Sequence, residues 1–278
     1  KAHLTCQMDI KGLWLLVMSR LIYSFYIDIQ KPVSHFENQK KFNNNYQWLL
    51  DRQKQYAELC GVDYKHFGYD ENYIEFSKRF GPEISEYNII NFYKTHLLYQ
   101  LDYDEILYLD FDVIPVTKLN FFEEWDLSKG IAIMSEKAST WRLKDHHRER
   151  HSVRSPLAKY WNARALCEEE KDVFNTGIIG ASKKCLKELD YFSDIDDTLR
   201  RMNDLINDEF WPEDIRNLFG YDNETIIACK LDEYQQLRDT GWHYFMDKWS
   251  YIPKDTKFIH CINKDFDYVR NWCEKNNL

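Results

Sequence analysis

Residues 106–112 read Ile-Leu-Tyr-Leu-Asp-Phe-Asp, an apolar run of strand length that ends in two carboxylates. Side chains two positions apart on an extended backbone point to the same face, so Asp110 and Asp112 are expected side by side. Two ionised carboxylates at this separation raise each other's pKa unless a cation lies between them. Hard oxygen ligands suit Mg²⁺ or Mn²⁺, so the pattern predicts a divalent metal site at a strand end. A solvated acidic turn is the simpler alternative.

The composition limits the class of protein and its partners. Hydrophobic residues make up 44% of the 278 residues, which is enough for the core of one α/β domain. Aromatic residues reach 16%, and Tyr and Trp often stack on sugars or bases, although cores use them as well. A net charge of −9 disfavours nucleic acid as the partner. An acidic protein that binds a nucleotide therefore needs a metal or a local basic patch.

The cysteines and the N-terminal apolar stretch bear on location. Seven cysteines are scattered without a C-x-x-C pair, which predicts neither a disulfide framework nor a zinc site. This favours a reducing compartment, and we expect a cytoplasmic protein. Arg20 and Asp28 interrupt the apolar stretch 12–29, so we expect no transmembrane segment. No small-residue cleavage site follows it, so we interpret it as a core strand over 13–18 and its continuation.

Strand-like and helix-like segments alternate along the chain. This order predicts a single α/β domain over residues 1–278, with a mainly parallel sheet flanked by helices. Strands are expected at 13–18, 62–67, 106–112, 130–134, 173–181 and 257–262, and helices at 46–60, 84–101, 183–207 with breaks, 223–230 and 265–275.

Residues 139–172 have no clean period and carry a basic cluster followed by acidic residues. Long excursions from a compact domain are often functional, so a lid or acceptor-binding insertion is one interpretation. A solvated surface insertion is the other.

Three further segments complete the pattern. They read Phe-Asn-Thr-Gly-Ile-Ile-Gly at 174–180, Gly-Tyr-Asp-Asn-Glu-Thr-Ile-Ile at 220–227 and Phe-Ile-His-Cys-Ile-Asn-Lys at 258–264. Together with the Asp-x-Asp motif, this order resembles GT-A fold glycosyltransferases. The resemblance is strongest to the retaining family of glycogenin and the bacterial lipopolysaccharide galactosyltransferases.

The resemblance assigns roles to individual residues. It implies metal binding by Asp110, Asp112 and His260, with Asp110 also reaching the ribose of the donor. Asn175 and Gly177 match a turn near the donor sugar.

Further matches concern the two halves of the donor. Asp222 and Asn223 match an Asp-Gln pair, in which the acid binds sugar hydroxyls and the amide lies beneath the anomeric carbon. Lys264 matches a diphosphate-binding lysine. The remaining donor-binding candidates are placed by position only, and they are Lys94, Ser19 and Arg20.

The implied activity is sugar transfer from a nucleotide-diphosphate sugar to a glycan, lipid or protein acceptor, with Mn²⁺ or Mg²⁺ and with retention. UDP-sugars are the favoured donors, and GDP-sugars are the alternative. Two other classes stay open. A haloacid-dehalogenase-type phosphohydrolase also uses Asp-x-Asp, but Ile114 stands where that chemistry wants Thr, and Asp196-Asp197 would have to serve as its late acidic pair. A non-catalytic module that binds nucleotide sugars or carbohydrates is the other.

Single residues also have simpler interpretations. His260 would be a core histidine, Asp222 a helix N-cap, and Lys94 a residue on a solvated helix face.

Overall fold

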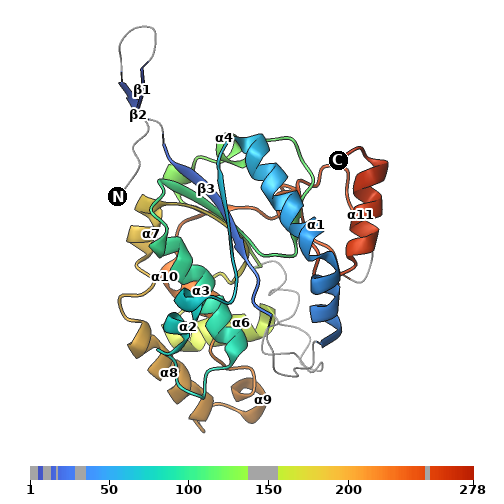
Figure 1. Cartoon of the computed structure of the whole chain (residues 1–278). Helices are drawn as coiled ribbons and strands as arrows, with labels where there is room; N and C mark the ends of the chain where they lie inside the picture. Colours follow the sequence, from blue (N-terminus) through green and yellow to red (C-terminus); the bar gives the residue numbers. More distant parts are fainter. Residues whose placement is uncertain (1–5, 9–13, 17, 29–35, 137–155, 248–250) are drawn as a thin grey trace.

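The computed structural model describes residues 6–8, 14–16, 18–28, 36–136, 156–247 and 251–278 (Figure 1). The strands are β1 (Cys6–Met8), β2 (Trp14–Leu16), β3 (Arg20–Phe25), β4 (Asp63–Phe67), β5 (Glu105–Leu109), β6 (Val113–Pro115), β7 (Ile131–Ser135), β8 (Phe174–Ser182), β9 (Tyr234–Gln236), β10 (Tyr244–Phe245) and β11 (Phe258–His260). The helices are α1 (Phe36–Cys60), α2 (Glu71–Ser77), α3 (Glu86–Gln100), α4 (Phe121–Glu124), α6 (Pro156–Cys167), α7 (Lys183–Leu189), α8 (Ile195–Asn207), α9 (Glu213–Arg216), α10 (Asn223–Lys230) and α11 (Phe266–Lys275), with a 3₁₀ turn η1 at Leu127–Lys129.

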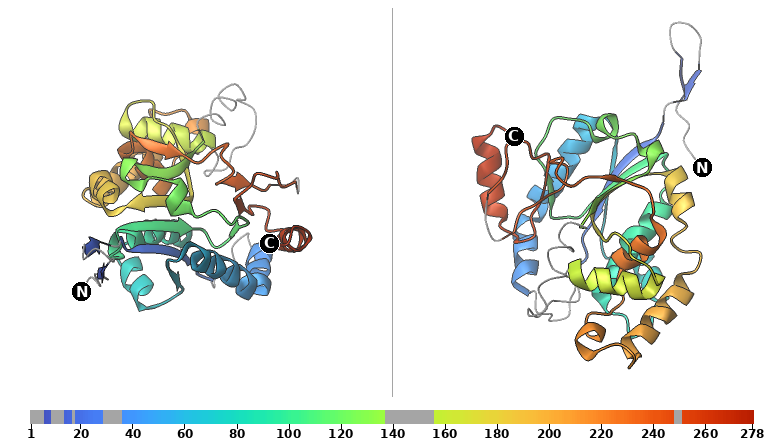
Figure 2. Two further views of the ribbon diagram at one scale, coloured as in Figure 1. Left: turned by 90° about the horizontal axis from the view of Figure 1, so that it is seen from above. Right: turned by 180° about the vertical axis from the view of Figure 1, so that it is seen from behind.

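The central sheet has six strands in the order β4-β3-β5-β8-β7-β9. The pairs β3–β4, β3–β5 and β7–β9 are parallel, and β8 runs antiparallel to both of its neighbours. Helices pack around this sheet, so the predicted α/β class is confirmed (Figures 1 and 2). Strands β3 and β5 are buried along almost their whole length, as expected for strands covered on both faces.

The first strand of the central sheet is β3, and the prediction of a core strand over 13–18 is wrong. Strand β2 pairs antiparallel with β1 in a separate two-stranded sheet, which projects from the body of the molecule in Figure 1. The continuation of the same apolar stretch instead supplies the core, with Leu21, Ile22 and Tyr23 fully buried. Strand β3 has a hydrogen-bonded neighbour on each side, which fixes it in the sheet.

A second, three-stranded sheet joins two distant parts of the chain. Its order is β10-β11-β6, with β11 antiparallel to β6 and His260 opposite Val113. Since β6 follows β5 after a three-residue turn, this pairing brings the late strand to the carboxyl end of β5. The candidate site lies at that junction.

Two predicted helices have recognisable ends. Helix α1 begins earlier than expected and ends at Cys60, after which Gly61 takes a positive φ of 66°, the usual geometry of a glycine that closes a helix. Helix α3 begins after Ser85, whose side chain accepts a hydrogen bond from the Asn88 amide.

Among the helices of the described residues, none is both long and apolar enough to cross a bilayer.

The expected insertion 139–172 is partly an ordered helix. Residues 139–155 of this range lie outside the described residues, and residues 156–167 form α6. Helix α6 packs against α10 and α8, and Leu157, Ala158 and Ala163 are buried. Its small and apolar residues lie on more than one face, which hid the helical period from the sequence.

Candidate metal and donor site

Asp110 and Asp112 lie in a tight turn rather than on one extended strand. Strand β5 ends at Leu109, and the Val113 amide donates to the Asp110 carbonyl at 2.9 Å. The prediction that an extended backbone aligns the two carboxylates is therefore wrong in its geometry. The turn nevertheless brings both side chains to one place, since each has an oxygen close to the same imidazole.

Asp110, Asp112 and His260, here called the metal trio, offer three ligand atoms that all lie within 4.8 Å of one another. Nε2 of His260 is 3.7 Å from Oδ2 of Asp110 and 3.5 Å from Oδ2 of Asp112. Ligand atoms around an octahedral ion with bonds of about 2.1 Å lie roughly 3–4 Å apart, so the trio fits one divalent ion after small adjustments. The side chain of Asp110 is 27% exposed, which leaves the site open to a ligand.

A second histidine sets the orientation of the His260 ring. Nδ1 of His260 lies 3.0 Å from Nε2 of His243, and both rings are buried. Burial and the neighbouring His260 hold the pKa of His243 well below its usual range, so His243 is neutral and can accept a hydrogen bond. A proton on Nδ1 of His260 then leaves Nε2 free as a ligand toward the carboxylates. Sequence reasoning missed His243, because no motif spacing marks it.

Gly177 is required by the close approach of this ring. A Cβ at position 177 would lie 2.4 Å from Cε1 of His260 and 2.7 Å from Nδ1. The Gly177 carbonyl also accepts from the Asp110 amide at 2.7 Å, and its own amide donates to Oδ1 of Asn175. The prediction of a turn at Asn175–Gly177 is wrong in its geometry, because these residues lie within strand β8, where the pairing with β7 shifts its register. Gly177 nevertheless lies directly against the metal trio.

Two lysines compensate the charge of the two aspartates. Nζ of Lys94 is 3.6 Å from Oδ1 of Asp110 and lies over the Tyr108 ring, whose hydroxyl donates to the same carboxylate. Lys94 is only 3% exposed, so its interpretation as a residue on a solvated helix face is wrong. Nζ of Lys264 contacts Asp112, and Lys264 has a positive φ of 57°.

The Asp112 carboxylate is buried and still charged. Burial alone would raise its pKa, but the attraction of Lys264 and of His260 outweighs burial and holds the pKa well below its usual range. A buried carboxylate that stays ionised is the form that a divalent cation binds. Lys264 and a metal ion would thus share one carboxylate, which brings the lysine next to any phosphate held by that ion.

Asp222 caps helix α10, as one interpretation predicted. Its carboxylate accepts from the amides of Glu224 and Thr225 and from the Thr225 hydroxyl at 2.8 Å. Asn223 is buried, and its Nδ2 donates to the Thr176 hydroxyl at 3.4 Å. Asn223 thereby contacts the segment of β8 that carries Asn175 and Gly177, whereas Asp222 bonds within the first turn of α10.

Three carboxylates converge beside this helix start, and we call Glu136, Asp222 and Glu224 the carboxylate cluster. Nζ of Lys159 lies 2.7 Å from Oε2 of Glu136 and 2.5 Å from Oε2 of Glu224. Oε1 of Glu224 accepts from the amide and hydroxyl of Thr176 at 2.7 and 2.9 Å. Sequence reasoning missed Lys159, Glu136 and Glu224, although Glu224 lies inside the 220–227 motif.

Burial raises the pKa of all three carboxyl groups, and their charged neighbours decide the net shift. The net shift differs among them. Burial raises the pKa of Asp222, helped by the charge of Glu224, and it raises the pKa of Glu136 more than Lys159 can offset. Burial also opposes ionisation of Glu224, but Lys159 and Lys94 outweigh it, so the pKa of Glu224 is lowered. Among these three carboxyl groups, neighbouring positive charge therefore outweighs burial only for Glu224.

Ser19 and Arg20 do not lie in the site. Arg20 is opposite Glu105 at the amino ends of β3 and β5 and forms an ion pair with it at 2.8 Å. Ser19 hydrogen-bonds Asp104 at the same edge. Asp110 follows the carboxyl end of β5, one strand length away, so the prediction that Ser19 and Arg20 bind the donor is wrong.

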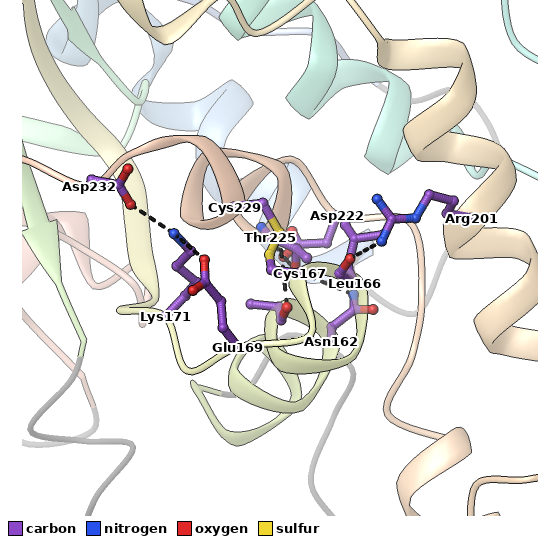
Figure 3. The surroundings of a disulfide bond; sticks show 11 residues. Asn162, Leu166, Cys167, Glu169, Lys171, Arg201, Asp222, Thr225, Cys229 and Asp232 are labelled. Carbon is purple, nitrogen blue, oxygen red and sulfur yellow. Dashed lines mark hydrogen bonds and ion pairs between the residues drawn. A yellow bond between two sulfur atoms is a disulfide. The ribbon is translucent and has the colours of Figure 1, made fainter.

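Cys167 and Cys229 form a disulfide between α6 and α10 (Figure 3). The expectation drawn from scattered cysteines is wrong for this pair, because sequence separation does not reveal which cysteines face each other. Cys60, Cys185, Cys261 and Cys273 are free and buried. A disulfide is typical of oxidising compartments, so it weighs against the cytoplasmic location that we expected.

The structure also bears on the phosphohydrolase alternative. Asp196 and Asp197 are exposed in the first turn of α8, and Asp197 pairs with Arg200 on the same helix. Ile114 is buried in β6. The late acidic pair of that alternative is therefore not part of the candidate site.

No family model and no curated protein matches the chain. Solved glycosyltransferase structures do resemble it. One, involved in glycosylation of the major capsid of PBCV-1, is 13% identical over 91% of this chain and 99% of that one, with a TM-score of 0.45. The galactosyltransferase LgtC is 12% identical over 87% of each chain, with a TM-score of 0.48. Mouse xyloside xylosyltransferase 1 is 11% identical over 88% of this chain and 97% of that one, with a TM-score of 0.47. With identities of 11–13% and TM-scores below 0.5, these likenesses carry no argument about function, which we rest on the site.

Proposed function

We propose that this chain is a divalent-metal-dependent glycosyltransferase that moves a sugar from a nucleotide-diphosphate sugar to a hydroxyl group of an acceptor. The carrying observation is the position of residues 175–177 of β8 between two groups of side chains. On one side, Gly177 lies against His260 of the metal trio. On the other, Thr176 binds Asn223 and Glu224. A ligand with a diphosphate and a sugar has the two chemistries that these groups would bind.

The metal trio suits the diphosphate. Two carboxylate oxygens and one imidazole nitrogen match Mn²⁺ well, and Mg²⁺ is the alternative that oxygen ligands also accept. A divalent ion bound there would act as a Lewis acid toward the leaving diphosphate. Lys264 beside Asp112 and Lys94 beside Asp110 add fixed positive charge where negative charge develops during transfer.

The carboxylate cluster suits the sugar. Carboxylate and amide oxygens accept hydrogen bonds from sugar hydroxyls, and Asp222 and Asn223 supply both kinds at the start of α10. The oxocarbenium-like transition state of glycosyl transfer is also stabilised by nearby oxygen atoms. We propose that Asp222 binds the sugar, that Asn223 lies near the anomeric carbon, and that the anomeric configuration is retained.

The donor and the acceptor complete the proposal. A UDP-sugar is the favoured donor, a GDP-sugar is the alternative, and the acceptor is a glycan, a lipid or a protein. We further propose that the insertion 139–172 contributes to donor or acceptor binding. Its C-terminal part, α6, already lies beside the carboxylate cluster through Lys159.

A thermal-shift panel of UDP, GDP and their sugar conjugates, with and without Mn²⁺, tests the donor. A true ligand at 100 times its Kd stabilises the folded state by about 2.7 kcal/mol. We expect this shift only when Mn²⁺ is present, and absence of any nucleotide shift contradicts the proposal.

Catalysis and stereochemistry need separate measurements. Mn²⁺-dependent hydrolysis of the donor that binds distinguishes an enzyme from a binding module. NMR of the product formed from an α-linked donor tests retention, and a β-linked product contradicts that part alone.

A further inference from the structure

Lys159 is the buried cation that connects α6 to the carboxylate cluster. It is 5% exposed, and its ammonium group has three N–H donors. Each donor has an acceptor, because Nζ lies 2.7 Å from Glu136, 2.5 Å from Glu224 and 3.2 Å from the Phe174 carbonyl. These acceptors come from the end of β7, the first turn of α10 and the start of β8. One side chain therefore fixes four elements to one another.

A chain of contacts leads from Lys159 to the metal trio. Glu224 takes Lys159 on one oxygen and the Thr176 amide and hydroxyl on the other. The next residue, Gly177, packs against His260 and accepts from the Asp110 amide. Loss of the lysine would release Glu224 and loosen its hold on β8 at Thr176, while the bond from the Asp110 amide still holds Gly177.

Helix α6 is held in place at its middle and at its end. At its middle, Asn162 donates to the Gly220 carbonyl at 2.8 Å, just ahead of Asp222. At its end, Cys167 is bonded to Cys229 of α10 (Figure 3). These two contacts hold α6 against α10. Lys159 extends from α6, so it holds the carboxylates of Glu136 and Glu224 in a fixed position relative to both helices.

We propose that Lys159 is a positioning residue for the sugar of the donor, which it serves by holding Glu224 and the first turn of α10 against residues 175–177 of β8. The proposal rests on the proposed function and adds the part of the donor on which Lys159 acts. Lys159 does not touch the metal trio in the structure, so the diphosphate is bound without it. We therefore expect loss of Lys159 to weaken binding of nucleotide sugars and to leave binding of the free nucleotide nearly unchanged.

The test compares binding of UDP with binding of UDP-glucose and UDP-galactose, each with Mn²⁺, in the wild type and in Lys159→Met. We expect the affinity for UDP to change less than about threefold, because the metal trio is not in contact with Lys159. The extra affinity that the sugar confers is expected to disappear. Transfer or donor hydrolysis at saturating donor is expected to fall about 100-fold, since misplacement by about 1 Å has an effect of that size.

Two further variants separate positioning from charge and from general stability. Lys159→Met combined with Glu136→Gln removes one positive and one negative charge, so the net charge is kept while the bridge to Glu224 is lost. We expect this variant to fold and still to lose the sugar preference. Lys230→Met is the matched control, because Lys230 lies at the other end of α10 from Glu224 and pairs with Asp194 and the Asp190 carbonyl.

The outcomes are distinct. If the double variant keeps the wild-type preference for UDP-sugar over UDP, the proposal for Lys159 is overturned while the proposed function stands. If Lys230→Met loses the preference to the same extent, general destabilisation explains the result and the proposal is also overturned. If the wild type binds neither UDP nor its sugars with Mn²⁺, the proposed function and the role of Lys159 fail together.

Discussion

Asp112 of the metal trio keeps its charge although it is buried, whereas Asp222 and Glu136 of the carboxylate cluster are shifted toward their neutral forms. Asp112 has Lys264 and His260 close by, and their attraction exceeds the effect of burial. In the cluster, Lys159 forms ion pairs with both Glu136 and Glu224. Its attraction lowers the pKa of Asp222 less than burial raises it. The same residue type could therefore hold a metal ion in the first region, whereas it caps a helix or pairs with a lysine in the second.

The difference teaches how one site can bind two kinds of chemical group. A divalent cation needs carboxylate oxygens that lie close together, and Asp110 and Asp112 provide them beside His260. A neutral sugar needs many hydrogen-bond partners and little excess charge, which burial and a shared lysine provide. The five predictions below test this contrast, beginning with the largest expected effect.

Asp112→Asn is expected to abolish Mn²⁺-dependent nucleotide binding and to leave the fold intact. The amide keeps the size of the side chain but removes the charge that binds the ion. Calorimetric titration with UDP and Mn²⁺ measures the loss. Asp102→Asn is the control, because Asp102 forms an exposed ion pair with Lys183 outside the site. Unchanged metal dependence in Asp112→Asn shows that the metal trio is assigned wrongly.

Replacing both Cys167 and Cys229 by Ser is expected to lower the free energy of unfolding by about 4 kcal/mol, from the chain entropy of a loop of this length. The disulfide closes 62 residues of sequence and joins α6, which carries Lys159, to α10, which carries Glu224. Urea denaturation measures the change, with the buried free thiol variant Cys273→Ser as the control. An equal loss of unfolding free energy in Cys273→Ser would show that the disulfide stabilises the fold no more than a single buried thiol does.

Gly177→Ala is expected to lower both stability and Mn²⁺ affinity, with overpacking costing about 1–3 kcal/mol. The new Cβ would overlap the His260 ring at 2.4 Å and push it from the carboxylates. Gly220→Ala is the matched control, because a Cβ there meets nothing within 4 Å. Thermal unfolding with and without Mn²⁺ separates the two effects. Equal behaviour of the two variants contradicts the packing of Gly177 on His260.

His243→Phe is expected to weaken Mn²⁺ binding about 10- to 100-fold, the usual result of losing the partner of a ligand histidine. Phe fills the buried space but cannot accept the proton of Nδ1 of His260. His96→Phe is the control, since His96 packs against Phe76 and Phe192 away from the trio. If the Mn²⁺ affinity of His243→Phe equals that of the wild type, His243 does not orient the His260 ring for metal binding.

Asp222→Asn is expected to have the smallest effect and the clearest pH dependence. A carboxyl group whose pKa is raised on folding binds more protons in the folded state than in the unfolded state between the two pKa values. Its contribution to stability therefore falls as the pH rises above the unfolded value of about 3.9. Asn still caps α10, so the variant is expected to gain stability relative to the wild type as the pH rises through this window.

Urea denaturation from acidic to neutral pH measures this difference, and it is expected to vanish below the unfolded pKa. Asp112→Asn provides the opposite case, because its wild-type pKa is lowered and its charge contributes stability at neutral pH. If both variants change stability in the same direction at neutral pH, the electrostatic contrast between the two regions is wrong.

Local sequence patterns predicted most of the strands and helices, and motif order predicted the metal trio. Strand β5, helix α3 and helix α10 with its Asp222 cap lie where the periodicity indicated. These features depend on residues close in sequence, so their physical causes can be read locally. The extended geometry of the Asp-x-Asp motif was wrong, because the tight turn after Leu109 depends on how β6 pairs with β11.

Predictions that needed distant partners failed more often. Lys94 looked like a solvated lysine, yet it is buried because Asp110 and the Tyr108 ring lie beside it. Ser19 and Arg20 were assigned to the wrong edge of the sheet, since the register with β5 is not encoded locally. Lys159 and His243 carry no motif at all, and each is defined only by the side chains that surround it.

The sequence by itself determined the α/β class, the carboxylates and histidine that can hold a metal, and the polar start of α10. Apolar strand runs, capping residues and ligand types act over a few residues, so they can be recognised without knowing the fold. Tertiary structure alone decided which charges are compensated, since Lys159 meets Glu136 and Glu224 from a distant helix. It also decided that Cys167 meets Cys229 and that His243 orients His260. Electrostatic energy and bond formation depend on distances of a few ångströms in space, and the packing of the elements sets those distances.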